Sequence, residues 1–234
     1  MSKIRTLIVL TAVFAWIAAY GGNMDVYMKM KVTQPDAKNK NQVEQIRETW
    51  ITPTKVRTNE GDQSSIFDVE KNVLITMDHA KKKYMEIPLD FSGSPASGEQ
   101  QNMMKMEVTV QPTSDEKEIN QWHCRKYIQN LKMSMGTTES EIWASENIHV
   151  NMDVYRKFNA ALMASQPGFY KMLKDMMKES EKIKGVTVFQ KSTSKMMGKN
   201  FESTMELLEV KEVKAPADLF VVPTGYKKEK FKES

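Results

Sequence analysis

The sequence holds one cysteine, Cys124, among its 234 residues. An internal disulfide is therefore excluded, and so is a Cys-X-X-Cys redox or zinc motif. Histidine is nearly as rare: His79, His123 and His149 are dispersed along the chain and form no compact set of metal ligands. We expect Cys124 to be a small buried hydrophobic residue, with an intermolecular bridge or a reactive thiol as the alternative.

The usual catalytic motifs are missing as well. The chain has no G-X-S-X-G, no H-E-X-X-H and no glycine-rich phosphate-binding loop. His123 and Cys124 are neighbours, but adjacent residues on a strand point to opposite faces and cannot pair for catalysis. No carboxylate lies in an apolar context that would tune an acid–base pair. We therefore predict a non-enzymatic protein with no catalytic residue, no metal site and no cofactor.

Concentrated charge of one sign is also absent. The formal net charge is +4, and 27% of the residues are charged. That balance excludes the basic stripe of a nucleic-acid-binding protein. The lysine-rich end, residues 225–234, is a local exception, and we predict that residues 229–234 form a disordered tail.

The N-terminus has the layout of a secretory signal peptide. Lys3 and Arg5 precede an uncharged apolar stretch over residues 7–20, and small residues follow up to Gly22. The stretch is shorter than the ~20 residues of a membrane-spanning helix, which is the alternative. We predict cleavage after residues 1–22, no stable membrane span afterwards, and export to the periplasm of a Gram-negative bacterium, with secretion as the alternative.

Alternation of apolar and polar residues dominates the mature part of the chain. In residues 24–33 one face holds Met24, Val26, Met28, Met30 and Val32, which is typical of a half-buried strand. Residues 64–87 predict a meander of short strands, with a turn at Asp78 followed by Lys81, Lys82 and Lys83. Charged residues at such a turn keep the hairpin soluble and hinder edge-to-edge pairing.

The period changes to helical at Asp153. A break at residues 166–168 separates this segment from a second amphipathic segment that ends at Gly185. The order predicts a mainly β (α+β) protein, in which about nine antiparallel strands form a single curved sheet, or half-barrel, with an inserted helical hairpin as a lid. One domain would span residues 23–228.

Four segments resemble a known family of exported proteins. They are "IFDVEKNVLITMDHAKKKYMEI" (66–87), "QWHCRKY" (121–127), "EIWAS" (141–145) and "LFVVPTGYKK" (219–228). The chain resembles the DUF4412 family over most of residues 24–228. That family is similar in fold to the lipoprotein-carrier superfamily, which includes the LolA and LolB types. The resemblance implies a half-barrel closed by a helical lid over a hydrophobic cavity, and no catalytic residues.

The resemblance and the alternating pattern together predict a cavity for a lipid or another hydrophobic ligand, such as a lipoprotein acyl chain. The predicted cavity walls are Met28, Met30, Ile46, Trp50, Phe67, Ile75, Met104, Met106, Val108 and Trp143. The predicted lid residues are Phe158, Leu162, Phe169, Leu173 and Met176. A one-residue error in register would move the residues of a whole strand to the other face.

Methionine is abundant, with 19 residues. Its unbranched, polarizable side chain suits an adaptable apolar surface, and most methionines here follow a strand or helix periodicity, as core residues do. Two alternatives remain. The apolar faces could fill a closed core in a structural or protein-interaction domain of the envelope, with no ligand. The thioethers could instead hold Cu(I).

Overall fold

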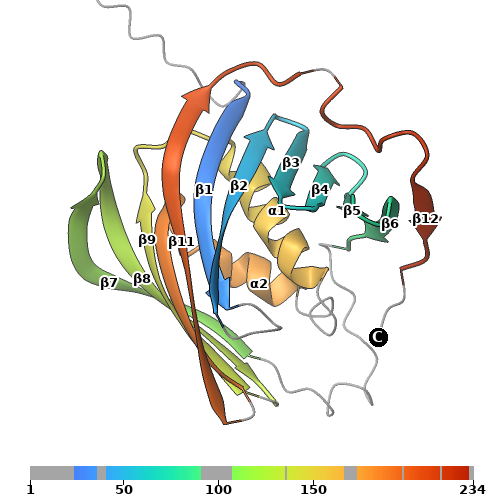
Figure 1. The fold of residues 1–234 in the computed structure, drawn as a ribbon. Helices are drawn as coiled ribbons and strands as arrows, with labels where there is room; N and C mark the ends of the chain where they lie inside the picture. Colours follow the sequence, from blue (N-terminus) through green and yellow to red (C-terminus); the bar gives the residue numbers. More distant parts are fainter. Residues whose placement is uncertain are drawn as a thin grey trace, which may run out of the picture.

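The computed structural model describes residues 24–35, 41–90, 107–134, 136–165, 173–196, 198–216 and 218–231. This part of the chain contains one large sheet and two helices (Figure 1). The strands are β1 (Val26–Pro35), β2 (Gln42–Ile51), β3 (Lys55–Glu60), β4 (Gln63–Asp68), β5 (Val73–Asp78), β6 (Lys83–Pro88), β7 (Glu107–Ile119), β8 (Trp122–Met133), β9 (Gly136–Ser145), β10 (Val186–Met196), β11 (Lys199–Glu212) and β12 (Lys227–Glu229). The helices are α1 (Met152–Ala164) and α2 (Leu173–Ser180). The predicted signal peptide lies outside the described residues.

The strands form a single sheet in the order β12-β6-β5-β4-β3-β2-β1-β11-β10-β9-β8-β7. All neighbours are antiparallel except β12, which pairs with β6 in parallel. The sheet curves around the two helices, which lie inside its bend (Figure 1). The predicted fold class, a curved antiparallel sheet with an inserted helical pair, is therefore confirmed. The described residues hold twelve strands rather than about nine, and the last of them, β12, ends at Glu229, where the predicted tail begins.

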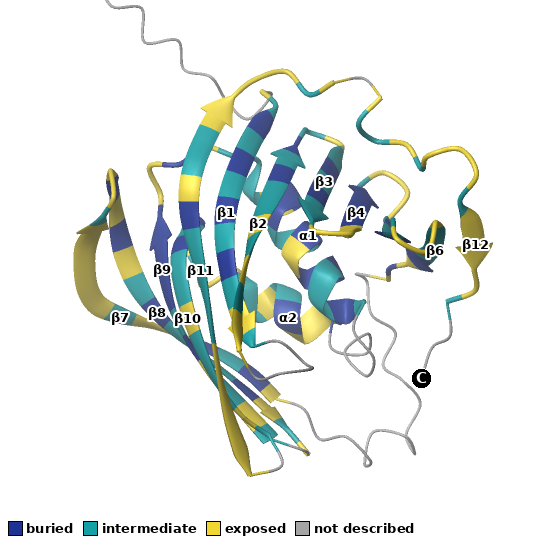
Figure 2. Cartoon of the chain, viewed as in Figure 1, coloured by how far each residue is buried: buried dark blue, intermediate teal, exposed yellow. Residues whose placement is uncertain are grey.

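The pattern in β1 shows why these segments become strands. Val26, Met28, Met30 and Val32 are all buried, and the residues between them are partly exposed. Figure 2 shows the resulting alternation along the strand. Met24, which the sequence places on the same face, precedes β1 and is exposed. One apolar face per strand then requires a covering layer, and the helices provide it.

Helix α1 begins where its sequence provides a cap. The side chain of Asn151 accepts a hydrogen bond from the backbone N–H of Val154 at 3.2 Å, which satisfies one free N–H of the first turn. Asp153 in that turn pairs with Lys157 at 2.8 Å. The helix then buries Val154, Tyr155 and Phe158 against the sheet.

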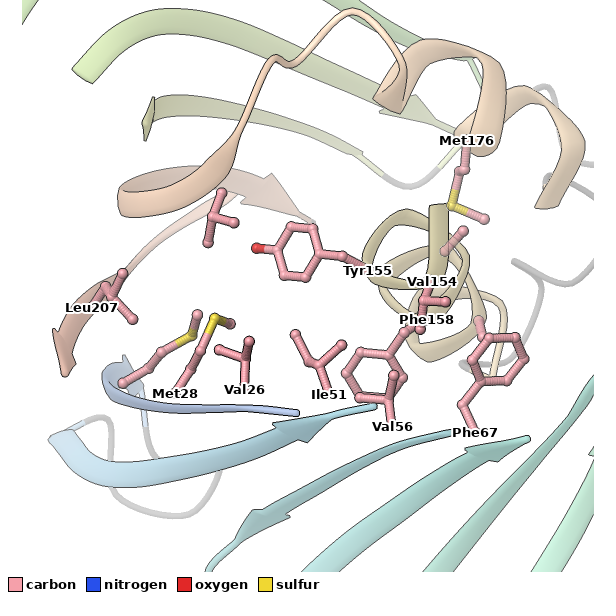
Figure 3. Packing of buried hydrophobic residues seen from close by; sticks show 14 of the residues in the cluster. Val26, Met28, Ile51, Val56, Phe67, Val154, Tyr155, Phe158, Met176 and Leu207 are labelled. Carbon is pink, nitrogen blue, oxygen red and sulfur yellow. The ribbon is translucent and has the colours of Figure 1, made fainter. Parts of the chain in front are cut away.

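The main core lies between the helices and the face of the sheet that they cover, here called the inner face. Val26, Met28 and Ile51 point from β1 and β2 toward Tyr155 of α1 (Figure 3). Phe67 of β4 is fully buried, and it lies close to Phe158 in the same view. Burial of an aromatic or aliphatic side chain of this size stabilises the fold by roughly 1.5–3 kcal/mol.

The turn at residues 78–81 forms as predicted. The Asp78 side chain accepts a hydrogen bond from the backbone N–H of Lys81 at 2.9 Å. Its other oxygen pairs with the Lys81 ammonium at 2.6 Å. His79 has a longer-range role: its ring nitrogens lie 2.7 Å from the Tyr226 hydroxyl and 2.8 Å from the Ser64 hydroxyl.

That contact joins the C-terminal segment, residues 213–231, to the opposite face of the sheet, here called the outer face. The segment leaves β11 and crosses to β12 at the edge beside β6 (Figure 1). Arg57 donates a hydrogen bond to the backbone oxygen of Leu219 at 2.7 Å. Ile66 and Met77, on the same outer face, are almost fully buried. Both faces of β4 are therefore covered.

Candidate ligand-binding groove

A groove of about 740 Å³ lies between the helices and the inner face of the sheet. Its walls come from strands β1 to β6 and β8 to β11 of the sheet, and from α1 and α2. Eight residues of α1 line it: Met152, Tyr155, Arg156, Phe158, Asn159, Ala160, Leu162 and Met163. The groove adjoins the core, because Met28 and Phe158 belong to both.

Methionine is the most prominent apolar residue of the groove. Seven methionines from five elements line it: Met28, Met30, Met85, Met152, Met163, Met176 and Met205. They differ in burial: Met28 and Met30 are almost fully buried, whereas Met205 is half-buried. The floor of the groove is thus apolar and deformable.

Polar groups line the rest of the walls. Thr49 and Thr58 face each other across β2 and β3, with their hydroxyls 3.1 Å apart. Ser65, Gln190 and Ser192 also line the groove. Arg47 donates to the Glu60 carboxylate at 2.6 Å, and its guanidinium lies 3.7 Å from the Met205 sulfur. The walls therefore combine an apolar floor with hydrogen-bonding groups and one internal ion pair.

The structure places five of the fifteen predicted residues in the groove lining: Met28, Met30, Phe158, Leu162 and Met176. Three more, Phe67, Val108 and Leu173, belong to the adjacent core. All three are less than 9% exposed, so they support the groove without lining it. Met104, Met106 and Phe169 lie outside the described residues.

Ile46 and Trp50 of β2 are on the wrong face. Thr49 and Ile51 point inward beside β1, so the residues between them point outward. Ile46 is 43% exposed, and the ring of Trp50 lies 4.9 Å from the ring of Tyr27 on the outer face. The prediction failed because the inner face of β2 is partly polar where it borders the groove.

Ile75 and Trp143 are also misplaced. Ile75 pairs with Ile66 on the outer face, because its neighbour Leu74 occupies the inner one. Trp143 follows Ile142, which lines the groove, so its indole points outward.

Polar and cationic groups surround the Trp143 indole on the outer face. Its N–H donates to Glu141 at 2.7 Å, and the Lys117 ammonium lies 3.9 Å from the ring centroid. Trp143 is 6% exposed and belongs to the same hydrophobic cluster as Phe67, Val108 and Leu173, but it does not line the groove.

The functional groups that the sequence did not single out are polar. Thr49 and Arg47 lie on the inner face of β2, and Arg156 lies on the groove side of α1. The available signal was the register with β1: Met28 lies opposite Thr49 and Met30 opposite Arg47. The inner face of β1 therefore identifies the inner face of β2.

A second, smaller pocket of about 390 Å³ lies at the start of α1. It shares Met152, Arg156 and Gly185 with the groove, so the two cavities adjoin. His149, Lys184, Glu146 and Glu212 line its other walls.

Metal-binding and nucleophilic groups are sparse in the described segments. They contain no group of three or more His, Cys, Asp or Glu side chains that could hold a metal ion. The thiol of Cys124 is fully buried, as expected, and burial raises its pKa to about 11. His123 lies on the exposed side of the same strand. Neither helix of the described part is long and apolar enough to cross a membrane.

The curved sheet, the helical pair inside its bend and the groove between them define an α+β half-barrel. The chain matches the family described as "Domain of unknown function (DUF4412)" over residues 24–226. It therefore belongs to the DUF4412 family. No curated protein matches the chain.

Solved structures of similar shape are distant in sequence. PNGF-II gives a TM-score of 0.44 at 11% identity, with 89% of this chain and 31% of that chain covered. The chain thus spans about a third of the length of PNGF-II. A LolA superfamily protein from Nitrosomonas europaea gives 0.33 at 5% identity, with 85% and 90% covered. A putative outer membrane lipoprotein-sorting protein domain from Vibrio parahaemolyticus gives 0.33 at 6% identity, with 85% and 89% covered.

Proposed function

We propose that this protein is a non-enzymatic binding protein that holds a lipid or another acyl-chain-like ligand in the groove. The observation that carries the proposal is the groove itself, about 740 Å³ with seven methionines in its lining. Its size falls in the range of roughly 300–1,000 Å³ that is usual for small-molecule sites. An apolar floor with a few polar groups on its walls suits a ligand with a long apolar part.

The methionines support a ligand of variable shape. A thioether side chain has three rotatable bonds and can fill irregular space, whereas branched side chains prefer one fit. Met163 and Met205 are only partly buried on opposite walls of the groove. Such walls can adapt to acyl chains of different length or saturation.

A single Cu(I) site is a weaker explanation of the same methionines. Met152 and Met163 are eleven positions apart on α1, which separates their backbone positions by about 16 Å. They cannot both bind one ion. Competition against a Cu(I) chelator checks this point, and we expect no stoichiometric uptake of copper at sub-nanomolar affinity.

Substitutions at two adjacent alanines of α1 distinguish a ligand-binding groove from a closed core. Both alanines are buried members of the core cluster, but Ala160 is 4% exposed and lines the groove, whereas Ala161 is fully buried and does not line it. Ala160→Phe should fill the groove and change the free energy of unfolding little, by about 1 kcal/mol or less. Ala161→Phe should overpack the core and cost roughly 1–3 kcal/mol.

The readout is binding of a neutral solvent-sensitive dye, together with urea unfolding. Wild type and Ala161→Phe that remains folded should bind the dye, and Ala160→Phe should not. If wild type binds no dye and Ala160→Phe is destabilised as strongly as Ala161→Phe, the groove is part of an ordinary core and the proposal is wrong.

We also propose that the protein acts outside the cytoplasm, in the periplasm of a Gram-negative bacterium. The support is the pattern of Lys3 and Arg5 before the apolar stretch 7–20. The intact mass of protein from the cell envelope should correspond to a chain that starts near Gly22 or Asn23. A species that keeps Met1 or Ser2 in that fraction would instead support a membrane anchor.

A further inference from the structure

Arg156 differs from the other charged residues of the groove. It lies on the groove side of α1, one turn after Met152, and it forms part of the wall between the groove and the smaller pocket. One terminal nitrogen of its guanidinium donates to the backbone oxygen of Ile183 at 3.3 Å. Within the described part of the chain, this backbone contact is the one hydrogen bond that holds the guanidinium beside the groove.

At least one further donor of Arg156 has no partner among the described residues. Its Nε–H is buried and meets no acceptor among the described residues. Across those residues, no carboxylate lies within ion-pair distance of this guanidinium, although the next residue, Lys157, has Asp153 at 2.8 Å. A buried donor without an acceptor costs roughly 1–3 kcal/mol, and more when the group is charged.

One charged residue of the groove lining has no oppositely charged partner in that lining. Three charged residues line it: Arg47, Glu60 and Arg156. Arg47 and Glu60 neutralise each other through their 2.6 Å contact. Arg156 is left as the uncompensated charge of the described lining. Glu146 and Glu212 line the smaller pocket, which Arg156 also lines, and not the groove.

A guanidinium with free N–H groups is the protein group best suited to bind a carboxylate or a phosphate. Met152 and Met163 lie on the same side of α1 and continue the apolar floor away from Arg156. An acyl chain and an anionic group attached to it would each meet a matching surface. On the basis of the proposed function, we propose that the ligand is an amphiphile with an anionic phosphate or carboxylate headgroup, which Arg156 binds.

The test compares ligands of one chain length and different headgroups. Dodecyl phosphate, dodecanoate and dodecanol each compete with a neutral solvent-sensitive dye bound to the whole protein. We expect both anions to bind wild type at least about tenfold more tightly than dodecanol, because a hydrogen bond to a charged group contributes this much or more. Equal affinities for all three compounds in wild type would overturn the proposal without any variant.

Arg156→Met removes the charge and keeps an apolar stem of similar length. This variant should bind dodecanol as wild type does and lose the preference for the anions. Lys157→Met is the matched control, because it removes a neighbouring cation of α1 that does not line the groove. It should keep the preference. If Arg156→Met keeps the preference, or if Lys157→Met loses it equally, the assignment to Arg156 is wrong.

Two further outcomes separate this inference from other readings. Inorganic phosphate should not displace the dye, because it lacks a chain, and displacement as strong as that by dodecyl phosphate would overturn the proposal in favour of a small free anion. Failure of wild type to bind the dye and all three amphiphiles would refute the proposed function, and this inference with it. Binding of dodecanol alone would refute only the role of Arg156.

Discussion

The side-chain carboxylate of Glu179, on α2, accepts a hydrogen bond from the backbone N–H of Val110, on β7, at 2.7 Å. Strand β7 is an edge strand of the sheet, so the backbone groups along its free edge have no neighbouring strand in the described structure. Glu179 gives one of those N–H groups an acceptor and attaches α2 to the sheet edge. An unprotected edge favours pairing with other chains, and this contact reduces that tendency.

Replacing Glu179 with alanine should therefore loosen both elements. We expect a loss of about 1 kcal/mol of unfolding free energy, because a buried N–H loses its acceptor. The Val110 amide should exchange with solvent faster than in wild type. Glu181→Ala is the control, since Glu181 is exposed and its carboxylate has no such contact with β7. Equal effects of the two substitutions would show that the hydrogen bond between Glu179 and Val110 does not contribute to stability.

The same contact predicts a pH dependence. Hydrogen bonds from Lys182 and from the Val110 N–H lower the pKa of Glu179 below its ordinary value of 4.5. A lowered pKa in the folded state means that the contribution to stability is present above about pH 4.5 and is lost as the pH falls through the folded-state pKa. Glu179→Gln should therefore flatten the dependence of the unfolding midpoint on pH below about 4.5.

Gly185 and Gly225 form a matched pair for backbone strain. Both have a φ of +87°, which L side chains rarely adopt. A Cβ at Gly185 would lie 2.1 Å from the backbone oxygen of Ser145, whereas a Cβ at Gly225 would meet nothing within 4 Å. We expect Gly225→Ala to cost roughly 1–2 kcal/mol and Gly185→Ala at least about 2 kcal/mol more. Urea unfolding measures both, and similar losses would contradict the packing of β9 against residue 185.

Cys124 should be chemically inert in the folded protein. Its thiol is fully buried and donates to the Trp122 backbone oxygen at 3.3 Å, and burial raises its pKa to about 11. At neutral pH the reactive thiolate is scarce. A colorimetric disulfide reagent should label Cys124 only after unfolding in urea. A cysteine introduced at the exposed position of Ser134 should react at once, and fast labelling of Cys124 itself in native protein would restore the reactive-thiol alternative.

His123 should titrate above the ordinary range for histidine. Hydrogen bonds with Glu118 and then with Glu116 raise its pKa above 6.5. Because the folded-state pKa is raised, the stabilising charge is present below pH 6.5 and is lost as the pH rises through the folded-state pKa. NMR titration of the ring protons should show the shift. Glu118→Gln should reduce it, and Glu107→Gln, on the same strand but paired with Lys132, should leave it unchanged.

Local pattern was sufficient for most of the sheet. The alternation of Met28 and Met30 with charged residues identified the inner face of β1 correctly, and the helical period placed Phe158 and Leu162 in the groove. These assignments worked because each apolar residue faces the layer that covers it. Strand β12 was missed because Lys227–Glu229 is short and polar and forms a strand only by pairing with β6.

Two of the failures, Ile75 and Trp143, share a physical cause, which is contact with segments far away in the sequence. Ile75 is on the outer face beside Ile66, where Arg57 binds Leu219 of the C-terminal segment, and the ammonium of Lys117 in β7 lies over the indole of Trp143. On β2 the rule that apolar residues face inward fails for a different reason. Thr49 and Arg47 point inward because a groove wall, unlike a core, can be polar. Ile46 and Trp50 then occupy the outer face.

The central claim is that the groove of the folded protein holds an amphiphilic ligand. Native mass spectrometry of protein purified from its own cells tests it most directly. The account predicts a folded species whose mass exceeds that of the chain by one lipid-like molecule, and loss of this adduct in Ala160→Phe but not in folded Ala161→Phe. A folded wild-type protein that carries no adduct, and takes up none after incubation with dodecyl phosphate or dodecanol, would contradict it.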